Sequence, residues 1–178
     1  VNVPSVSINL PSVTEKDRRF IEWAVKNDVD FIAHSFVRSA RDIKAVQDIL
    51  DAHGSKIKII AKIENREGVN NIDSILAAAD AVMVARGDLG VEIDFTELPG
   101  IQKTIIDRSF SFGKPIVTAT QMLDSMHTRA VPTRAEVSDI YNAVLDGASS
   151  LMLTGETAAG QYPVQAMEYL VKTAQTAL

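Results

Sequence analysis

The chain has 178 residues, 46% of them hydrophobic and 23% charged, which is typical of one soluble globular domain. Its 18 basic and 23 acidic residues give a formal net charge of −5, which argues against a nucleic-acid-binding surface. There is no cysteine, which excludes disulfides and thiolate chemistry, and no apolar run is long enough to span a membrane. We expect a cytoplasmic protein with neither nucleic acid nor membrane as a partner.

Five short runs of apolar and β-branched residues alternate with longer amphipathic stretches. Continuous hydrophobicity over about four to six residues is typical of strands covered on both faces, as in parallel sheets. The predicted strands are 29–33, 57–61, 81–85, 115–119 and 150–153. The predicted helices begin after Thr14, which is a suitable N-cap, and continue with 39–54, 71–79, 98–112, 133–146 and 163–177. Trp23, on the first of them, is expected to be buried against a neighbouring helix.

This alternation predicts an α/β fold with right-handed crossovers. Successive strands begin about 24 to 34 residues apart, which is the size of one unit of a βα barrel. The competing fold, a doubly wound sheet, normally carries a Gly-rich turn after its first strand, and this sequence has none there. We therefore predict a partial TIM (β/α)8 barrel of about five parallel strands and six helices, with residues 1–178 as a single unit.

Polar residues follow every predicted strand. They are His34-Ser35, Lys62 to Glu64, Arg86-Gly87-Asp88, Thr120-Gln121 and Thr154-Gly155-Glu156. In βα barrels the carboxyl ends of the strands carry the active site, so these residues are candidate site residues. The alternative is that each strand simply becomes polar where it leaves the core.

Lys62 and Glu64 are two residues apart on a strand, so their side chains point to the same side. They form either a buried ion pair that closes the barrel or a functional pair, with Glu64 as a metal ligand and Lys62 facing a phosphoryl or enolate oxygen. Asp88 follows Gly87 at the expected start of a short helix, where free amides bind carboxylate or phosphate. Two carboxylates without Cys or His indicate Mg²⁺ or Mn²⁺. Thr120 is placed to hydrogen-bond a substrate carboxylate.

Six blocks of the sequence resemble the pyruvate kinase family, in that family's order. They are IIAKIENREGV at 59–69, VMVARGDLGVE at 82–92, TATQML at 118–123, PTRAE at 132–136, NAVLDG at 142–147 and MLTGETA at 152–158. The resemblance covers nearly the whole chain. It implies the second part of a catalytic barrel, from an enzyme that transfers the phosphoryl group of phosphoenolpyruvate to ADP and so gives pyruvate and ATP.

The resemblance also implies roles for individual residues. Lys62 would stabilise the transferring phosphoryl group and the enolate oxygen, while Glu64 and Asp88 would hold the divalent metal. The amides of Gly87 and Asp88, with the Thr120 hydroxyl, would bind the carboxylate of phosphoenolpyruvate or pyruvate. In the family's arrangement Arg86 reaches toward a neighbouring subunit of what is expected to be a homotetramer. Apart from the resemblance, Arg134 stands in the first turn of a predicted helix, where the dipole disfavours a cation, so we expect it to pair with a carboxylate or with a partner chain.

The family also uses an arginine and K⁺ ligands from its first strands, a lid domain and a C-terminal effector site, which we do not find in this sequence. We therefore expect the isolated chain to be inactive. Two further hypotheses are a Mg²⁺-dependent enolate lyase or mutase on a similar barrel, and a folding or assembly module without catalysis.

The chain length fits this interpretation. A barrel of about 250 residues has about 31 per unit, so five units and an opening segment come to about 176 residues. The sequence also starts at Val1 and not at Met, as a trimmed piece would. Such a piece has two open sheet edges, and we expect it to self-associate or distort to cover them.

Overall fold

The computed structural model describes residues 11–178, which form one parallel sheet with helices around it. The strands are β1 (Phe31–His34), β2 (Lys58–Ile63), β3 (Ala81–Ala85), β4 (Ile116–Ala119) and β5 (Ser150–Met152). All five lie within one to three residues of the runs expected from the sequence.

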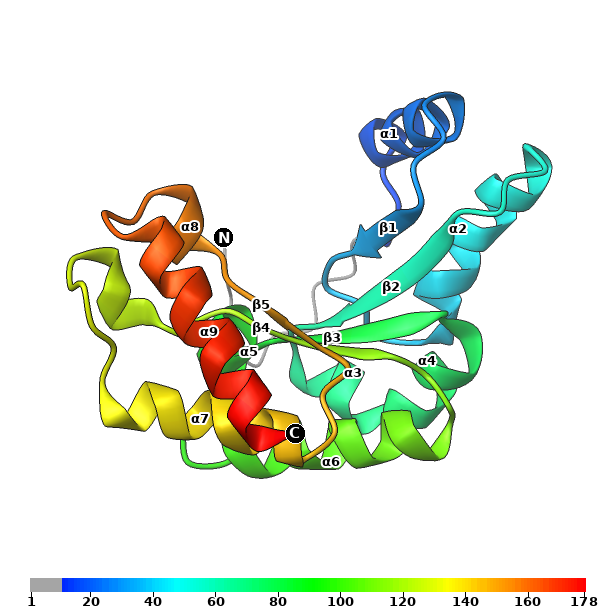
Figure 1. The fold of residues 1–178 in the computed structure, drawn as a ribbon. Coiled ribbons are helices and arrows are strands. Elements are labelled where there is room, and N and C mark those ends of the chain that lie inside the picture. Colours follow the sequence, from blue (N-terminus) through cyan, green and yellow to red (C-terminus); the bar gives the residue numbers. More distant parts are fainter. Residues whose placement is uncertain (1–10) are drawn as a thin grey trace.

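The strands lie side by side in the order of the chain, and every neighbouring pair is parallel. A doubly wound sheet reverses its strand order at a switch point, and no reversal occurs among the described strands. Figure 1 shows the strands fanning through the middle of the molecule, with α2, α4, α6, α7 and α9 following one another along its outside. The prediction of a partial barrel is confirmed.

The six expected helices are all present. They are α1 (Glu15–Lys26), α2 (Ala40–Ala52), α4 (Ile72–Ala78), α6 (Leu98–Ser111), α7 (Arg134–Leu145) and α9 (Pro163–Ala177). Four shorter helices were not all foreseen: α3 (Arg66–Asn70), α5 (Arg86–Glu92), η1 (Asp124–His127) and α8 (Gly155–Ala158). Each short helix follows one of the strands β2 to β5.

Capping boxes fix the starts of two long helices that follow irregular segments. The Thr14 hydroxyl accepts from the Asp17 amide at the start of α1, and the Asp17 carboxylate accepts from the Thr14 amide at 2.8 Å. Thr133 and Glu136 exchange the same pair of hydrogen bonds at the start of α7. Both satisfy amides that would otherwise lack a partner in the first helical turn.

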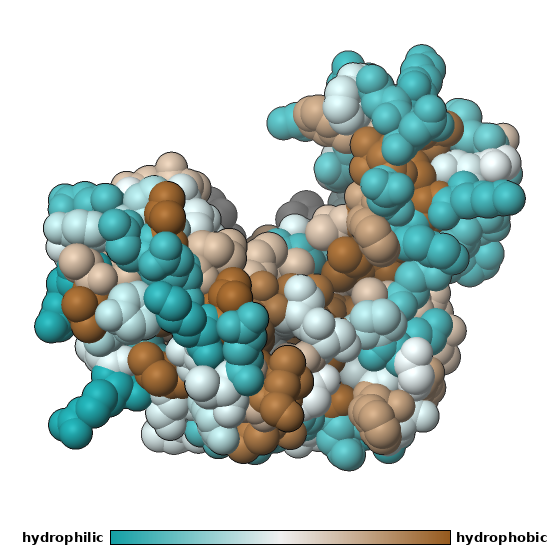
Figure 2. Space-filling view, in the orientation of Figure 1, coloured by the Kyte–Doolittle hydropathy of each residue, from teal (hydrophilic) through white to brown (hydrophobic). Residues whose placement is uncertain are grey.

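Burial falls from the centre of the sheet to its edges. Every residue of β3 is buried, whereas no residue of β1 or β5 is buried, each being exposed or half-buried. Close to the β1 edge, Phe20, Trp23 and Phe31 are 60%, 58% and 56% exposed. We expected Trp23 to be buried against a helix, which is wrong, because no described element packs over that side of α1. Figure 2 shows the molecule hollowed between the part with α1 and α2 and the part with α8 and α9.

Two apolar clusters hold the sheet to the helices. The larger packs the inner faces of α1, α2, α4 and α6 against β2 and β3, with Ile59, Ile63, Val84 and Ile105 at most 1% exposed. The smaller joins η1, α7 and α9. The packed core therefore lies on the helix side of the sheet, and polar side chains remain at the carboxyl ends of the strands.

Candidate active site

Residues after three neighbouring strands meet at one edge of the sheet. The strands β2, β3 and β4 are adjacent and parallel, and Ala85 at the end of β3 is in register with Ala119 at the end of β4. Chain segments that leave parallel strands in the same direction reach the same rim. The Lys62–Glu64, Arg86–Asp88 and Thr120–Gln121 segments therefore share one rim.

Lys62 and Glu64 form the centre of this rim. Glu64 is fully buried, and its Oε1 lies 2.7 Å from Lys62 Nζ, so the two side chains do point to the same side. Lys62 also donates to the Ser35 hydroxyl at 3.1 Å, and the Phe36 amide donates to Glu64 Oε2 at 2.6 Å. The ammonium approaches Oε1 closely but not along a hydrogen-bond direction, so that oxygen has no hydrogen-bond donor in residues 11–178.

His34, at the end of β1, is the nearest titratable group on the neighbouring strand. Burial lowers the pKa of His34, although the carboxylates of Asp42, Asp17 and Glu64 partly oppose this effect. The imidazole is therefore neutral at pH 7, and Lys62 supplies the positive charge beside Glu64.

The structure brings Gly87 and Thr120 together. The Gly87 amide donates to Thr120 Oγ1 at 2.7 Å, across the boundary between β3 and β4. Asp88 is partly buried in the first turn of α5, a short helix at the place where the sequence predicted one. Because the hydroxyl accepts from Gly87, its own hydrogen is left to donate to a further group.

The two arginines named from the sequence differ in their surroundings. Arg86 is 7% exposed, and its guanidinium donates to groups of its own chain, among them the Thr120 carbonyl and Asp139. Arg134 is exposed at the start of α7. Contact of either residue with a neighbouring subunit stays a prediction.

The oxygen ligands at this rim are few. Among residues 11–178, no three His, Cys, Asp or Glu side chains converge as a metal site. The candidate set from the sequence has two carboxylates, Glu64 and Asp88. It fits a hard divalent ion in one respect, because Glu64 Oε1 is a buried oxygen without a hydrogen-bond donor. The remaining ligands would have to be water or substrate oxygens.

Sequence reasoning named Glu156 only as a polar residue after the last strand and did not foresee that Glu156 and Glu136 fix the segment after β4. Glu156 is 1% exposed and accepts from the amides of Leu123 at 3.0 Å and Thr154 at 2.8 Å. Glu136 accepts from the amide and hydroxyl of Ser125, at 2.7 and 2.6 Å, in addition to its capping contacts. The capping box in PTRAE was a usable signal for Glu136. The contacts of Glu156 join strands that no local pattern relates.

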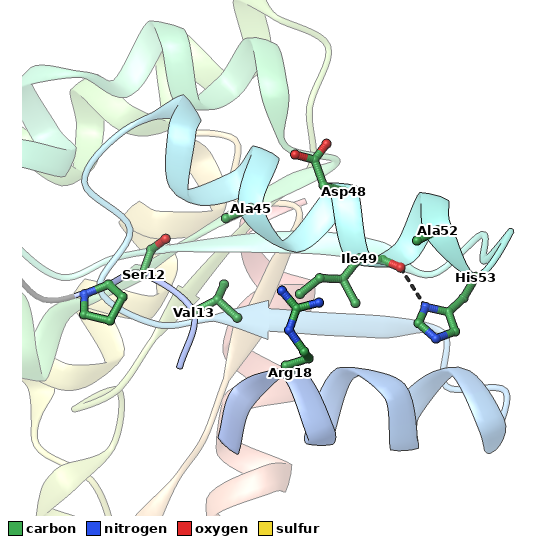
Figure 3. Close-up of a pocket in the computed structure, with 9 residues that line it drawn as sticks. Ser12, Val13, Arg18, Ala45, Asp48, Ile49, Ala52 and His53 are labelled. Atoms are coloured by element: carbon green, nitrogen blue, oxygen red, sulfur yellow. Dashed lines mark hydrogen bonds between the residues drawn. The ribbon is translucent and has the colours of Figure 1, made fainter. Parts of the chain in front are cut away.

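One cavity lies away from this rim and a second borders it. The first, of about 440 Å³, lies between α1, α2 and residues 11–13, with Arg18 directed into it and His53 bonded to the Ile49 carbonyl at 2.9 Å (Figure 3). The other, of about 670 Å³, lies between α5, α6 and α7 and includes Arg86, Gln102, Gln121 and Asp139 in its wall. Neither contains Lys62, Glu64 or Asp88.

The fold and the polar rim define a segment of a βα-barrel protein with its candidate site at the carboxyl ends of the strands. No helix of residues 11–178 has the length and apolar character needed to cross a membrane. The family model for the barrel domain of pyruvate kinase matches residues 1–167. The chain belongs to the pyruvate kinase family.

Curated relatives agree with this assignment. The pyruvate kinase of Geobacillus stearothermophilus is 59% identical over 169 residues, which are 94% of this chain and 29% of the relative. Those of Bacillus licheniformis and Borreliella burgdorferi are 55% and 52% identical, over 94% and 98% of this chain and 29% and 37% of their own lengths. The chain thus spans about a third of the relatives it matches.

Proposed function

We propose that this chain is the second part of the catalytic barrel of a pyruvate kinase, whose complete protein transfers the phosphoryl group of phosphoenolpyruvate to ADP. In this reaction the bond between phosphorus and the enol oxygen breaks, a bond to the β-phosphate of ADP forms, and the enolate takes up a proton to give pyruvate. The observation that carries the proposal is the Lys62–Glu64 pair, 2.7 Å apart at a rim shared with Asp88 and Thr120. Family membership supports it.

Lys62 supplies the positive charge. Its ammonium group is held between Ser35 and Glu64, and its side chain is 24% exposed, so it is fixed but still accessible from the rim. Phosphoryl transfer asks a protein mainly for positioning and for compensation of negative charge. Lys62 would compensate the charge on the transferring phosphoryl group and on the enolate oxygen.

Glu64 and Asp88 would hold Mg²⁺ or Mn²⁺. When bound, such an ion would supply positive charge that offsets the negative charge of the phosphate and substrate oxygens. Glu64 Oε1 offers a buried oxygen that the ion would share with Lys62, and Asp88 offers a second carboxylate in the first turn of α5. K⁺ would act in the complete protein, with ligands from segments other than this chain.

Thr120, Gly87 and Asp88 would bind the carboxylate of phosphoenolpyruvate or pyruvate. The Thr120 hydroxyl already accepts from the Gly87 amide, so it would donate its own hydrogen to the carboxylate. The amides at the start of α5 would add to this interaction. This arrangement orients the substrate without a further charge.

We further propose that the isolated chain does not turn over substrate, because it spans only about a third of its relatives' lengths. The complete protein would be a cytoplasmic homotetramer, with Arg134 exposed for contact between subunits and Arg86 buried behind that surface. The chain by itself would associate through its open sheet edges.

The activity is tested in a chimeric enzyme, in which this chain replaces the matching segment of the Geobacillus stearothermophilus relative. We expect it to form pyruvate from phosphoenolpyruvate and ADP, and Lys62→Met to lower kcat about 100- to 1,000-fold. Lys56→Met removes an exposed lysine and should leave kcat unchanged. Carbon–carbon cleavage without phosphoryl transfer would favour the lyase, and equal kcat for both variants would overturn the role of Lys62.

The metal site is tested on the chain itself by the effect of Mn²⁺ on water proton relaxation. We expect weak binding that is lost in Glu64→Gln and in Asp88→Asn. Asp94→Asn is the matched control, because Asp94 accepts from Thr96 in the next loop and should not contribute. Absence of Mn²⁺ binding by the unsubstituted chain would favour the assembly module, and binding that survives both site variants would overturn the assignment of Glu64 and Asp88 as ligands.

A further inference from the structure

The backbone after β4 is strained at two successive residues. Thr120 has φ +70° and Gln121 has φ +52°, and neither is a glycine. The left-handed region is unfavourable for side chains with a Cβ, and most of all for β-branched ones such as threonine. Such a conformation persists only where the surrounding contacts enforce it.

Arg86 supplies contacts of this kind. Its Nε and Nη2 both donate to the Thr120 carbonyl, at 3.0 and 2.7 Å, and Nη2 also donates to the Gln121 carbonyl at 3.0 Å. Two nitrogen atoms of the planar guanidinium group thus donate hydrogen bonds to the carbonyls of both strained residues. The ammonium group of a lysine has no planar array of donors, so it could not make this set of contacts from one fixed position.

The other side of the guanidinium is fixed as well. Nη1 donates to Asp139 of α7 at 2.6 Å, and Gln102 of α6 lies at 3.4 Å. Asp139 compensates the charge of the buried arginine, while the main-chain part of Arg86 begins α5 directly after β3. Arg86 is therefore anchored on three elements before it reaches the turn.

Thr120, whose carbonyl accepts from Arg86, is also the residue whose hydroxyl accepts from the Gly87 amide. Because Arg86 and Gly87 are consecutive, one short segment holds the Thr120 carbonyl by a side chain and its hydroxyl by a main-chain amide. Rotation of the Thr120 backbone toward ordinary φ values would break both contacts. The position of the hydroxyl thus depends on the arginine.

We propose that Arg86 is a positioning residue for the substrate carboxylate, which it serves by holding Thr120 and Gln121 in the left-handed conformation. The proposal rests on the proposed function, in which Thr120 binds that carboxylate. Because the carboxylate takes no part in bond breaking, its contacts act on ground state and transition state alike, and their loss appears in KM more than in kcat.

The test is a double-mutant cycle in the chimeric enzyme described above. We expect Arg86→Ala and Thr120→Val each to raise KM for phosphoenolpyruvate about tenfold, the effect of losing one hydrogen bond, with a smaller change in kcat. The double variant should be no worse than either single one, because Arg86 acts through Thr120. Effects on KM that multiply would overturn the proposal.

Two further measurements separate positioning from general stability. The cavity of about 670 Å³ beside Arg86 admits a guanidinium ion, which should lower KM of Arg86→Ala at concentrations that do not unfold the protein, whereas ammonium should not. Arg108→Ala, which removes the exposed double contact to Asp73, is the matched control and should leave KM unchanged. If guanidinium and ammonium lowered the KM of Arg86→Ala equally, the planar guanidinium geometry would not be what positions Thr120.

Hydrogen exchange at the Gly87 amide, measured on the chain itself, tests the role of Arg86 without depending on the proposed function. In Arg86→Lys we expect this amide to exchange about tenfold faster, while amides of β3 keep their rates. An unchanged exchange rate at the Gly87 amide would show that Arg86 does not hold Thr120 in place. A chimeric enzyme that is inactive before any substitution would overturn the proposed function and, with it, the role of Arg86 toward substrate. The hydrogen-exchange rate at Gly87 would still show whether Arg86 holds Thr120 in place.

Discussion

The ammonium group of Lys62 lies 2.7 Å from a carboxylate, Glu64, that is fully buried. Among the described residues, Lys62 is the ion-pair partner of Glu64 and the Phe36 amide donates a hydrogen bond to its carboxylate. A buried charge that loses its partner is strongly destabilising, whereas loss of the whole pair is often nearly neutral. The pair thus links the candidate chemistry to the stability of the fold.

Lys62→Met should therefore destabilise the chain. The reason is the complete burial of Glu64, whose carboxylate would lose its ionic partner. We predict a loss of roughly 2 to 4 kcal/mol in the free energy of unfolding, below that of a fully buried pair because Lys62 is 24% exposed. Urea denaturation measures it.

The matched variants make this prediction specific. Lys62→Met combined with Glu64→Gln should recover most of the loss, because no buried charge is left without a partner. Lys44→Met removes the lysine of an exposed pair with Asp48 and should leave the urea midpoint unchanged. If the combined variant were as unstable as the sum of its two substitutions, the ion pair would not be the cause.

The segment after β4 should be sensitive to acid through Glu156. Burial raises the pKa of Glu156, but hydrogen bonds from the amides of Leu123, Glu156 itself and Thr154 outweigh burial and hold it below the ordinary value of 4.5. A carboxylate with a lowered pKa stabilises the fold above its unfolded pKa, and this contribution is lost as the pH falls through the folded pKa. Its full effect is therefore expected at neutral pH.

The measurement compares urea midpoints of the chain and of Glu156→Gln from pH 7 downward. We expect the variant to be about 1 to 3 kcal/mol less stable at pH 7, and the difference to shrink below about pH 4.5. Glu168→Gln, on the exposed face of α9, should follow the unsubstituted chain at every pH. A difference that stayed constant with pH would mean that the charge of Glu156 is not what matters.

The strain at Gln121 predicts a stabilising substitution. Gln121 is exposed and has φ +52°, so Gln121→Gly removes an unfavourable Cβ contact without disturbing the core. We expect a gain of about 0.5 to 1 kcal/mol in the free energy of unfolding, because the relief of strain exceeds the entropy cost of glycine. Gln121→Ala keeps the strain and is the control. Equal stabilities of the two variants would contradict the assignment.

The sequence predicted the sheet because its strands are short runs of apolar and β-branched residues that hydrophobicity alone identifies, although only β3 is buried at every position. The same reasoning placed Lys62 and Glu64 on one side of β2, since side chains alternate along a strand. It failed for Trp23 because an amphipathic stripe on α1 does not reveal which neighbour covers it. It also missed the hydrogen bond of Glu156 with Leu123 and those of Arg86 with Thr120, because both join residues more than 30 positions apart through contacts of irregular backbone.

The exposed edge of β1 should drive association of the isolated chain. The strand has no neighbour on one side among the described residues, and Phe20, Trp23 and Phe31 form an exposed apolar surface close to it. Unpaired strand edges next to apolar side chains are ready sites for pairing between copies. We expect the sedimentation coefficient to rise with protein concentration and the emission of Trp23, the single tryptophan, to shift to the blue as it becomes buried.

Phe31→Lys should weaken this association, because a charge at an open edge opposes pairing. Phe110→Lys is the control of equal chemistry, since Phe110 is 81% exposed but lies on α6, away from the edge. The first variant should shift the association to higher concentration and keep the emission of Trp23 red, and the second should do neither. A chain that sediments as a monomer at all concentrations, with both edge strands intact by hydrogen exchange, would show that the open edges are tolerated without a partner.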